Sequence, residues 1–170
     1  MGAVLSRQDI FKRLKQEPPL VEGCLDPETQ VQPNGIDLTL RDVSVLQTPG
    51  RIATSNSQRS VSDLTPLMFD TAGFIDLLAG AYMVTLNEIV HLPNNVMALG
   101  RPRSSLLRCG VTIGTAVWDA GYSGRSQSLM VVYNPRGFRV QKNARILQLV
   151  FFQLTGETEG YQGAYQDENI

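Results

Sequence analysis

Residues 35–41 read Gly-Ile-Asp-Leu-Thr-Leu-Arg, and this stretch decides the fold class. Its apolar side chains stand at every second position, at Ile36, Leu38 and Leu40, and polar side chains separate them. Successive side chains of a β-strand point to opposite faces, so this alternation predicts a half-buried strand. Asp37 is then expected on the polar face of that strand.

Further runs typical of strands follow along the chain, and glycine or proline stands between most of them. They cover residues 82–86, 96–99, 111–118, 129–133 and 146–154. Several short strands at this spacing predict an all-β domain, either a sandwich, a jelly roll or a barrel. Residues 48–65 are rich in Ser, Thr, Asn and Gln, so we expect a long surface excursion there.

The two ends of the chain differ from this β-rich middle. A short N-terminal helix is expected over residues 6–17, because Ser6 can cap it and Asp9 follows three residues later. Residues 155–170 hold almost no aliphatic side chains, so we expect a flexible C-terminal tail that becomes ordered only against another surface. The 170 residues are read as a single domain, 1–170.

The composition excludes several classes of protein. A net charge of −1 with 18% charged residues gives no basic excess for binding nucleic acid or an anionic membrane. The single histidine, His91, and two distant cysteines, Cys24 and Cys109, are too few for a zinc site, so no protein-bound metal is expected. No signal peptide and no apolar run of the ~20 residues that cross a bilayer are found. We therefore expect a cytoplasmic protein.

Residues 101–108, Arg-Pro-Arg-Ser-Ser-Leu-Leu-Arg, concentrate cations and hydroxyls in an otherwise charge-poor chain. Guanidinium groups bind phosphate through paired hydrogen bonds, and serine hydroxyls can fill the remaining positions. A short helix that opens at Ser104 or Ser105 would add backbone amides. The segment is either a phosphate site or a solvated basic turn that forms surface ion pairs.

Residues 118–125, Trp-Asp-Ala-Gly-Tyr-Ser-Gly-Arg, place a glycine-bracketed turn at the end of a strand. A rigid turn can aim the Asp119 carboxylate at a water molecule while Tyr122 packs flat on a sugar or base. The alternative is an Asp119 that caps a β-turn and a Tyr122 at the edge of the core. Gln148 interrupts the apolar strand 145–149, so its amide either satisfies backbone groups or reaches a ligand.

Taken in order, these segments resemble the superfamily of trimeric deoxyuridine triphosphatases (dUTPases) and dCTP deaminases. The matching segments are residues 34–38, 103–108, 119–124 and 145–149, with 161–166 as the closing tail. The second segment has the longer form typical of the deaminase-like branch. The resemblance implies a distorted jelly-roll protomer and a homotrimer whose active sites are shared between neighbouring subunits.

The resemblance also implies a role for each residue of the site. Asp119 would activate the attacking water, and Tyr122 would pack against the deoxyribose, with Val117 and Trp118 as further residues of the sugar and base site. The phosphates would be held by Arg103, Ser104, Ser105, Arg108 and Gln148. The tail would close over the nucleotide through Tyr161, Tyr165 and Gln166. Mg²⁺ would bind the phosphates with few or no protein ligands.

One position separates the two activities of the superfamily. The strand after the third segment resembles Leu-Glu-x-x-Asn in the deaminases, where the Glu carries protons, but counting back three residues from Asn134 gives Val131. No other acid lies between Asp119 and Asn143. We therefore expect a dUTP diphosphatase that releases dUMP and pyrophosphate. A dCTP deaminase, alone or bifunctional, and a nucleotide-binding regulator without turnover are the alternatives.

Overall fold

The computed structural model describes residues 3–170, and a curled antiparallel sheet of nine strands forms the body of this part of the chain. The sheet has the order β10-β8-β14-β3-β6-β12-β9, with β2 and β4 paired to β3. Its strands are β2 (Val31–Gln32), β3 (Gly35–Leu46), β4 (Leu64–Pro66), β6 (Gly80–Leu86), β8 (Val96–Pro102), β9 (Val111–Gly114), β10 (Val117–Trp118), β12 (Gln127–Val132) and β14 (Arg145–Gln153). The predicted all-β fold class is confirmed, and the predicted run 111–118 is divided between β9 and β10.

Two smaller sheets complete the β-structure. They are β1 (Val21–Glu22), β7 (Ile89–His91) and β11 (Ser123–Gly124), and the pair β5 (Phe74–Leu77) and β13 (Phe138–Gln141). His91, the single histidine, is the last residue of β7.

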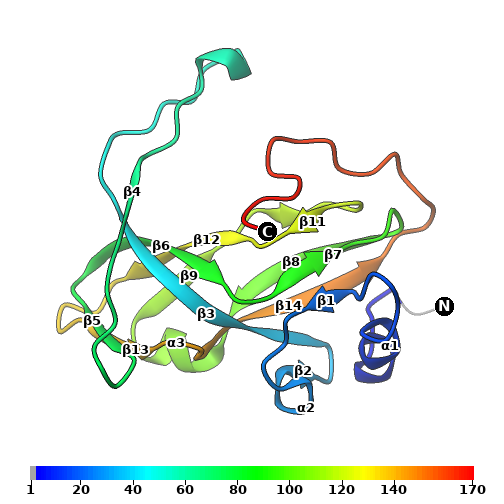
Figure 1. Ribbon diagram of the computed structural model, residues 1–170, viewed down its shortest axis with the longest axis horizontal. Helices are drawn as coiled ribbons and strands as arrows, with labels where there is room; N and C mark the ends of the chain where they lie inside the picture. The colour runs from blue at the N-terminus through cyan, green and yellow to red at the C-terminus, as the bar shows by residue number, and fades with distance from the viewer. Residues whose placement is uncertain (1–2) are drawn as a thin grey trace.

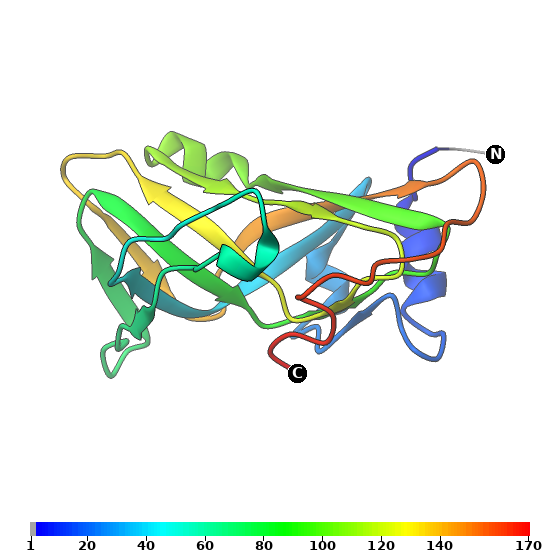
Figure 2. The same ribbon diagram turned by 90° about the horizontal axis from the view of Figure 1, so that it is seen from above.

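The long strand β3 belongs to both halves of the curled sheet. Its first half pairs with β14, where Asp37 lies opposite Gln148, and its second half pairs with β6. The register shifts close to Leu40 in both pairings, and Figures 1 and 2 show the strands crossing one another where the sheet curls. The sequence predicted that one face of this strand would be polar and exposed. That prediction is wrong for residues 35–40, where both faces of β3 are buried. The helices α1 (Arg7–Arg13) and α2 (Pro27–Gln30) contact β3.

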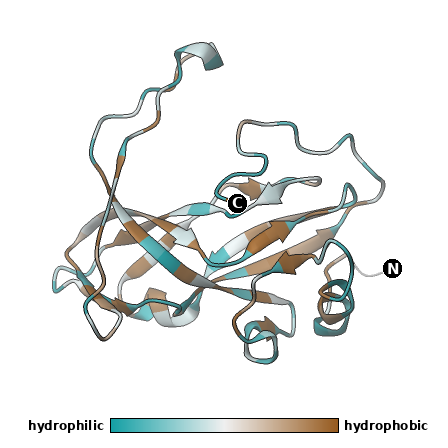
Figure 3. Ribbon diagram, viewed as in Figure 1, coloured by the Kyte–Doolittle hydropathy of each residue, from teal (hydrophilic) through white to brown (hydrophobic). Residues whose placement is uncertain are grey.

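The core fills the inside of this curl. Phe151, Leu147 and Leu149 of β14 and Ile36 and Leu38 of β3 are fully buried. Burial of each such side chain contributes roughly 1.5–3 kcal/mol, so the β3–β14 pair is a major source of stability. In Figure 3 the hydrophobic colour is concentrated on the strands of the body.

Three short α-helices lie around the sheet: α1 (Arg7–Arg13), α2 (Pro27–Gln30) and α3 (Ser104–Arg108). The capping box predicted for Ser6 and Asp9 is present, but α1 ends earlier than the predicted residue 17, since the amides of Lys15 and Gln16 already bond three residues back. Helix α3 begins at Ser104, where the sequence analysis considered a short helix, whereas α2 was not expected. Among the described residues no helix has the length and apolarity needed to span a membrane.

Two segments extend from the body. Residues 47–63 project as the predicted excursion, where Arg51 and Ser60 exchange backbone hydrogen bonds of 2.7 and 2.9 Å and the 3₁₀ turn η1 (Asn56–Gln58) forms the tip (Figure 1). The tail, residues 155–170, returns across the molecule and ends beside β11. Glu168 of the tail and Gly124 of β11 form a parallel β-bridge.

Candidate functional site

The turn after β10 is held against a neighbouring segment of backbone. The amide of Tyr122 donates to the carbonyl oxygen of Asp119, and Leu92 exchanges hydrogen bonds with Gly121 and Tyr122, the shorter being 2.8 Å. Gly121 has a φ of 83°, a left-handed conformation that favours glycine. The turn therefore presents Asp119 and Tyr122 from a fixed backbone, as the sequence predicted.

This turn borders a cavity of about 300 Å³ that we call the Tyr122 pocket. Its lining residues are Ala116, Val117, Trp118, Asp119, Tyr122, Ser126, Gln127, Tyr161, Tyr165 and Glu168. The structure thus brings together the predicted sugar and base residues, the predicted catalytic Asp119 and two predicted tail tyrosines. Gln166 of the tail lies close by and donates to the carbonyl oxygen of Gly121.

A chain of hydrogen bonds forms one wall of the Tyr122 pocket. The indole N–H of Trp118 donates to Ser126 Oγ at 2.5 Å, Ser126 Oγ lies 3.1 Å from the hydroxyl of Tyr122, and that hydroxyl donates to Glu168 Oε1 at 2.8 Å. Burial raises the pKa of the Tyr122 hydroxyl, so this group remains a proton donor. Ser126 and Glu168 were not identified from the sequence, because nothing local marks them as partners of Tyr122.

Asp119 differs from these fixed side chains. Its carboxylate is exposed and accepts no hydrogen bond from any residue between 3 and 170. It also lines a second cavity of about 440 Å³ beside Tyr161 and Thr158, so it stands between two hollows. An exposed carboxylate at such a place is free to accept a proton from a water molecule.

The tail packs closely on the turn. The Tyr161 amide donates to the carbonyl oxygen of Ala120 at 2.8 Å, and the Tyr161 ring meets the Tyr122 ring edge-on with centroids 5.7 Å apart. A Cβ atom on Gly121 would lie 2.7 Å from the Cα atom of Gly160, so this approach requires the absence of a side chain.

The predicted phosphate-binding residues lie elsewhere: Gln148 is in β14, Arg103 follows the end of β8, and Ser104, Ser105 and Arg108 belong to α3. Asp37 and Arg101 lie directly opposite Gln148 on its two sides, so these three side chains share a face. The adjoining helix α3 is anchored by buried Leu106. We call this region the cationic face and define it as Arg101, Arg103, Ser104, Ser105, Arg108 and Gln148.

Most side chains of the cationic face have no partner. Within residues 3–170, Ser104, Ser105 and Arg108 are exposed and Gln148 is half-buried, and none of the four makes a side-chain hydrogen bond or ion pair. Their donors are therefore available to an anion.

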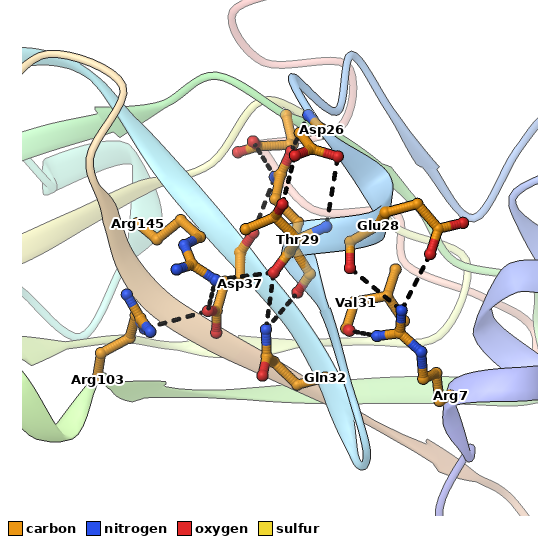
Figure 4. Close-up of polar contacts among 11 residues, drawn as sticks. Arg7, Asp26, Glu28, Thr29, Val31, Gln32, Asp37, Arg103 and Arg145 are labelled. Carbon is orange, nitrogen blue, oxygen red and sulfur yellow. Dashed lines mark hydrogen bonds and ion pairs between the residues drawn. The ribbon is translucent and has the colours of Figure 1, made fainter.

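Arg103 is held by a contact that the sequence did not reveal. Its Nε lies 3.1 Å from Asp37 Oδ2, and Nη1 of Arg145 lies 3.3 Å from the same oxygen (Figure 4). Asp37 is only 1% exposed, and burial raises the pKa of its carboxyl while the two arginines oppose the shift. Asp37 therefore orients Arg103 through its Nε atom. The two terminal nitrogens of the Arg103 guanidinium have no partner among the described residues and remain available to an anion.

The Tyr122 pocket and the cationic face lie far apart in one chain. Trp118 pairs with Ala98, so Asp119 is level with Met97, six residues before Arg103 along β8. At about 3.3 Å per residue this places the two regions roughly 20 Å apart.

Comparisons with known proteins show the family of the chain. A family model described as dCTP deaminase-like matches residues 4–154. Similar proteins named probable deoxyuridine 5′-triphosphate nucleotidohydrolase occur in Methanosarcina mazei, at 52% identity over 98% of both chains, and in Archaeoglobus fulgidus, at 48% identity over 99% of this chain and 98% of that protein.

One solved structure shows the same fold. It is the 2′-deoxycytidine 5′-triphosphate deaminase from Agrobacterium tumefaciens, with a TM-score of 0.64 and 20% identity over 89% of this chain. The present chain spans about half of that protein, since it covers 49% of its length. With its motifs, its fold and a family match over residues 4–154, this chain belongs to the dCTP deaminase-like family.

Proposed function

We propose that this protein is a dUTP diphosphatase, which hydrolyses dUTP to dUMP and pyrophosphate. The observation that carries the proposal is the exposed Asp119, which accepts no hydrogen bond within residues 3–170 and lines an aromatic pocket of about 300 Å³. The relatives named probable deoxyuridine 5′-triphosphate nucleotidohydrolase, with 52% and 48% sequence identity over nearly the full chain, support dUTP as the substrate. The free thiols of Cys24 and Cys109 agree with a cytoplasmic location.

In the proposed reaction, Asp119 accepts a proton from the attacking water. The water oxygen forms a bond to the α-phosphorus while the bond from that phosphorus to the oxygen bridging the α- and β-phosphates breaks. Pyrophosphate leaves with the electron pair of the broken bond. Negative charge on the phosphate oxygens would be stabilised by the guanidinium groups of Arg103 and Arg108.

Nucleoside recognition is assigned to the Tyr122 pocket. Tyr122 would pack against the deoxyribose and leave no room for a 2′-hydroxyl, with Trp118 and Val117 beside the base. Tyr161, Tyr165 and Gln166 would hold the tail over the nucleotide. Tyr122 suits this role because its ring is fixed at both its edge and its hydroxyl.

The separation of the two regions supports a shared active site. Asp119 must reach the α-phosphorus, whereas the cationic face of the same chain lies roughly 20 Å away along β8. A triphosphate cannot contact both groups of one chain. We propose a homotrimer in which the Tyr122 pocket of one subunit faces the cationic face of its neighbour.

Mg²⁺ is proposed as part of the substrate. The part of the chain that the structure describes has no cluster of three or more His, Cys, Asp or Glu residues that could hold a metal ion. Mg²⁺ binds phosphate oxygens readily and keeps several waters, so it fits a complex with dUTP better than a cage of protein ligands.

Mixing two inactive variants tests the shared site. At a dUTP concentration well below the weakened Kd of Arg108→Ala, the Asp119→Asn and Arg108→Ala subunits should each show little activity alone. Subunit exchange should restore hydrolysis at about one site in four, where an intact Asp119 meets an intact Arg108. The readout is pyrophosphate release from dUTP, with dCTP, dTTP and UTP as competing substrates and with Mg²⁺ present or omitted. Mixtures that form mixed trimers but stay inactive would show that the site is not shared.

A dCTP deaminase is the second candidate, because the matching family model and the solved relative both carry that name. Val131 lies in β12 between Ala81 and Thr112 and cannot carry a proton. Glu168 brings a second carboxylate into the Tyr122 pocket, but its Oε1 is occupied by the Tyr122 hydroxyl. Ammonia release from dCTP would establish deamination, and its absence alongside pyrophosphate release from dUTP supports the diphosphatase.

A further inference from the structure

We propose that Glu168 of the tail is a positioning residue, which fixes the Tyr122 ring and thereby makes the site discriminate 2′-deoxyribose from ribose. The inference rests on the proposed function, since it assumes that Tyr122 packs on the sugar. Glu168 lies outside the tail segment 161–166 that carries the resemblance to the family.

The ionised carboxylate of Glu168 can only accept hydrogen bonds, and this sets the direction of those in the pocket wall. An indole N–H can only donate, so Ser126 Oγ must accept from Trp118. The Ser126 hydroxyl hydrogen is then free to bond the oxygen of Tyr122, and the Tyr122 hydrogen is left for the Glu168 carboxylate. Glu168 is therefore the terminal acceptor on which the order of the whole chain depends.

Tyr122 needs this acceptor because its side chain is buried. The residue is 6% exposed, and its hydroxyl has Ser126 and Glu168 as its partners within residues 3–170. A buried hydroxyl that loses its acceptor carries a desolvation penalty. The ring would then tilt toward water and vacate the space in which a 2′-hydroxyl would otherwise collide with it.

The backbone brings Glu168 to one defined place. The Arg125 amide donates to the carbonyl oxygen of Glu168 at 2.9 Å, and the Asp167 amide donates to the carbonyl oxygen of Ser123 at 2.8 Å. These bonds form the parallel bridge between Glu168 and Gly124. The tail is thus held on both sides of the carboxylate, which limits the positions that Glu168 can adopt.

Gly124 supplies the space for this contact. A Cβ atom at this position would lie 2.5 Å from the Tyr122 hydroxyl oxygen and 3.2 Å from Cγ of Glu168. A residue with any side chain would therefore separate the two partners. Tyr122 of the turn, Gly124 of β11 and Glu168 of the tail therefore fit one another closely, which supports a specific contact.

The test measures affinity for dUMP and UMP, neither of which is a substrate, in the full-length oligomer. Glu168→Ala should reduce the preference for dUMP over UMP about tenfold, the loss expected for a hydrogen bond to a charged group. Glu168→Gln should keep the preference, because its amide oxygen can accept the same bond. Tyr122→Phe should behave like Glu168→Ala, and adding Glu168→Ala to Tyr122→Phe should cause no further loss. Glu159→Ala is the matched control, an exposed tail acid with no hydrogen bond or ion pair to the described residues.

Hydrogen exchange of the Arg125 and Asp167 amides provides a second readout. Glu168→Ala should speed exchange at both, and Glu168→Gln should not. An unchanged preference in Glu168→Ala, or an equal loss in Glu168→Ala and Glu168→Gln, would overturn the inference. If the wild-type protein binds dUMP selectively but releases no pyrophosphate from dUTP, the proposed hydrolysis fails while the role of Glu168 is still decided by binding.

Discussion

The Tyr122 pocket is closed by side chains of its own chain, whereas the cationic face ends in side chains that have no partner within residues 3–170. The pocket uses its polar atoms internally: Trp118, Ser126, Tyr122 and Glu168 bond one another. On the cationic face only Arg103 is held, by Asp37, and its terminal amino groups remain free. Changes in the first region should therefore alter order and selectivity, and changes in the second should alter affinity for the phosphates.

The largest effect is expected at Asp119, the exposed carboxylate that lines the Tyr122 pocket. Asp119→Asn should lower turnover of dUTP by roughly 10²–10⁴-fold, the contribution typical of a general base. Because Asp119 bonds no described side chain, the melting temperature and nucleotide affinity should change little. Pyrophosphate release and calorimetric binding measure the two quantities. Persistent turnover would place the base elsewhere.

Removal of a charge from the cationic face should lower the affinity for dUTP. Arg108→Ala should weaken dUTP binding by about 1.5–3 kcal/mol, the worth of a hydrogen bond to a charged group. Because Arg108 contacts no described side chain, the free energy of unfolding should stay unchanged. Arg139→Ala is the control, since Arg139 is an exposed arginine on β13 whose ion pairs within residues 3–170 are with Asp70 and Asp76. Equal losses of affinity in both variants would remove the distinction between a phosphate site and general positive charge.

A substitution in the Tyr122 pocket should lower the free energy of unfolding and loosen the tail. Gly124→Ala should cost about 1–3 kcal/mol as an overpacked site, because its Cβ atom would meet the Tyr122 hydroxyl. Tail amides should exchange faster in this variant. Gly156→Ala is the matched control in the tail, where a Cβ atom meets nothing within 4 Å. If the two variants unfold at the same urea concentration, the fit around Tyr122 is looser than described.

The smallest effect concerns the support beneath the cationic face. The side-chain amide of Gln30 donates through Nε2 to Glu88 Oε1 at 2.7 Å and to the carbonyl oxygen of Asp37 at 2.9 Å. Glu88 is fully buried. Burial raises the pKa of Glu88, so the folded protein binds more protons than the unfolded chain just above the ordinary value of 4.5. The free energy of unfolding should therefore fall as the pH rises from 4.5 toward the raised pKa.

Urea unfolding of the wild type and of Glu88→Gln across that pH range measures this slope. The variant should show a shallower decline, since it lacks the titrating group. Asp37 and Glu168 have raised pKa values as well, so part of the slope should remain. A slope identical to that of the wild type would show that Glu88 titrates alike in the folded and unfolded states.

Local patterns were sufficient to predict the long strands of the large sheet and the turn, but not the short strands β1, β2, β4, β5, β7, β11 and β13. The alternation at Ile36, Leu38 and Leu40 depends only on neighbouring residues, and so does the glycine-bracketed turn at Asp119. The burial of Asp37 could not be predicted in the same way, because an alternation of apolar and polar residues does not show that α1 and α2 pack on β3.

Contacts between distant parts of the chain could not be predicted. Asp37 and Arg145 are 108 positions apart, and Tyr122 and Glu168 are 46 apart. The resemblance named the segments but not these pairs. The docking of the tail on the turn could have been predicted from the close spacing of Gly121 and Gly124, since glycines in a turn indicate that another segment of backbone approaches it closely.

The shared strand β3 also sets the order of events during synthesis. Its first half pairs with β14, so the sheet cannot be completed until the ribosome has added more than one hundred further residues. At about 5–20 residues per second, the apolar edge of β3 waits roughly 5–20 s for its partner. The nascent chain is therefore exposed to aggregation during translation, and productive folding awaits the release of its last strand.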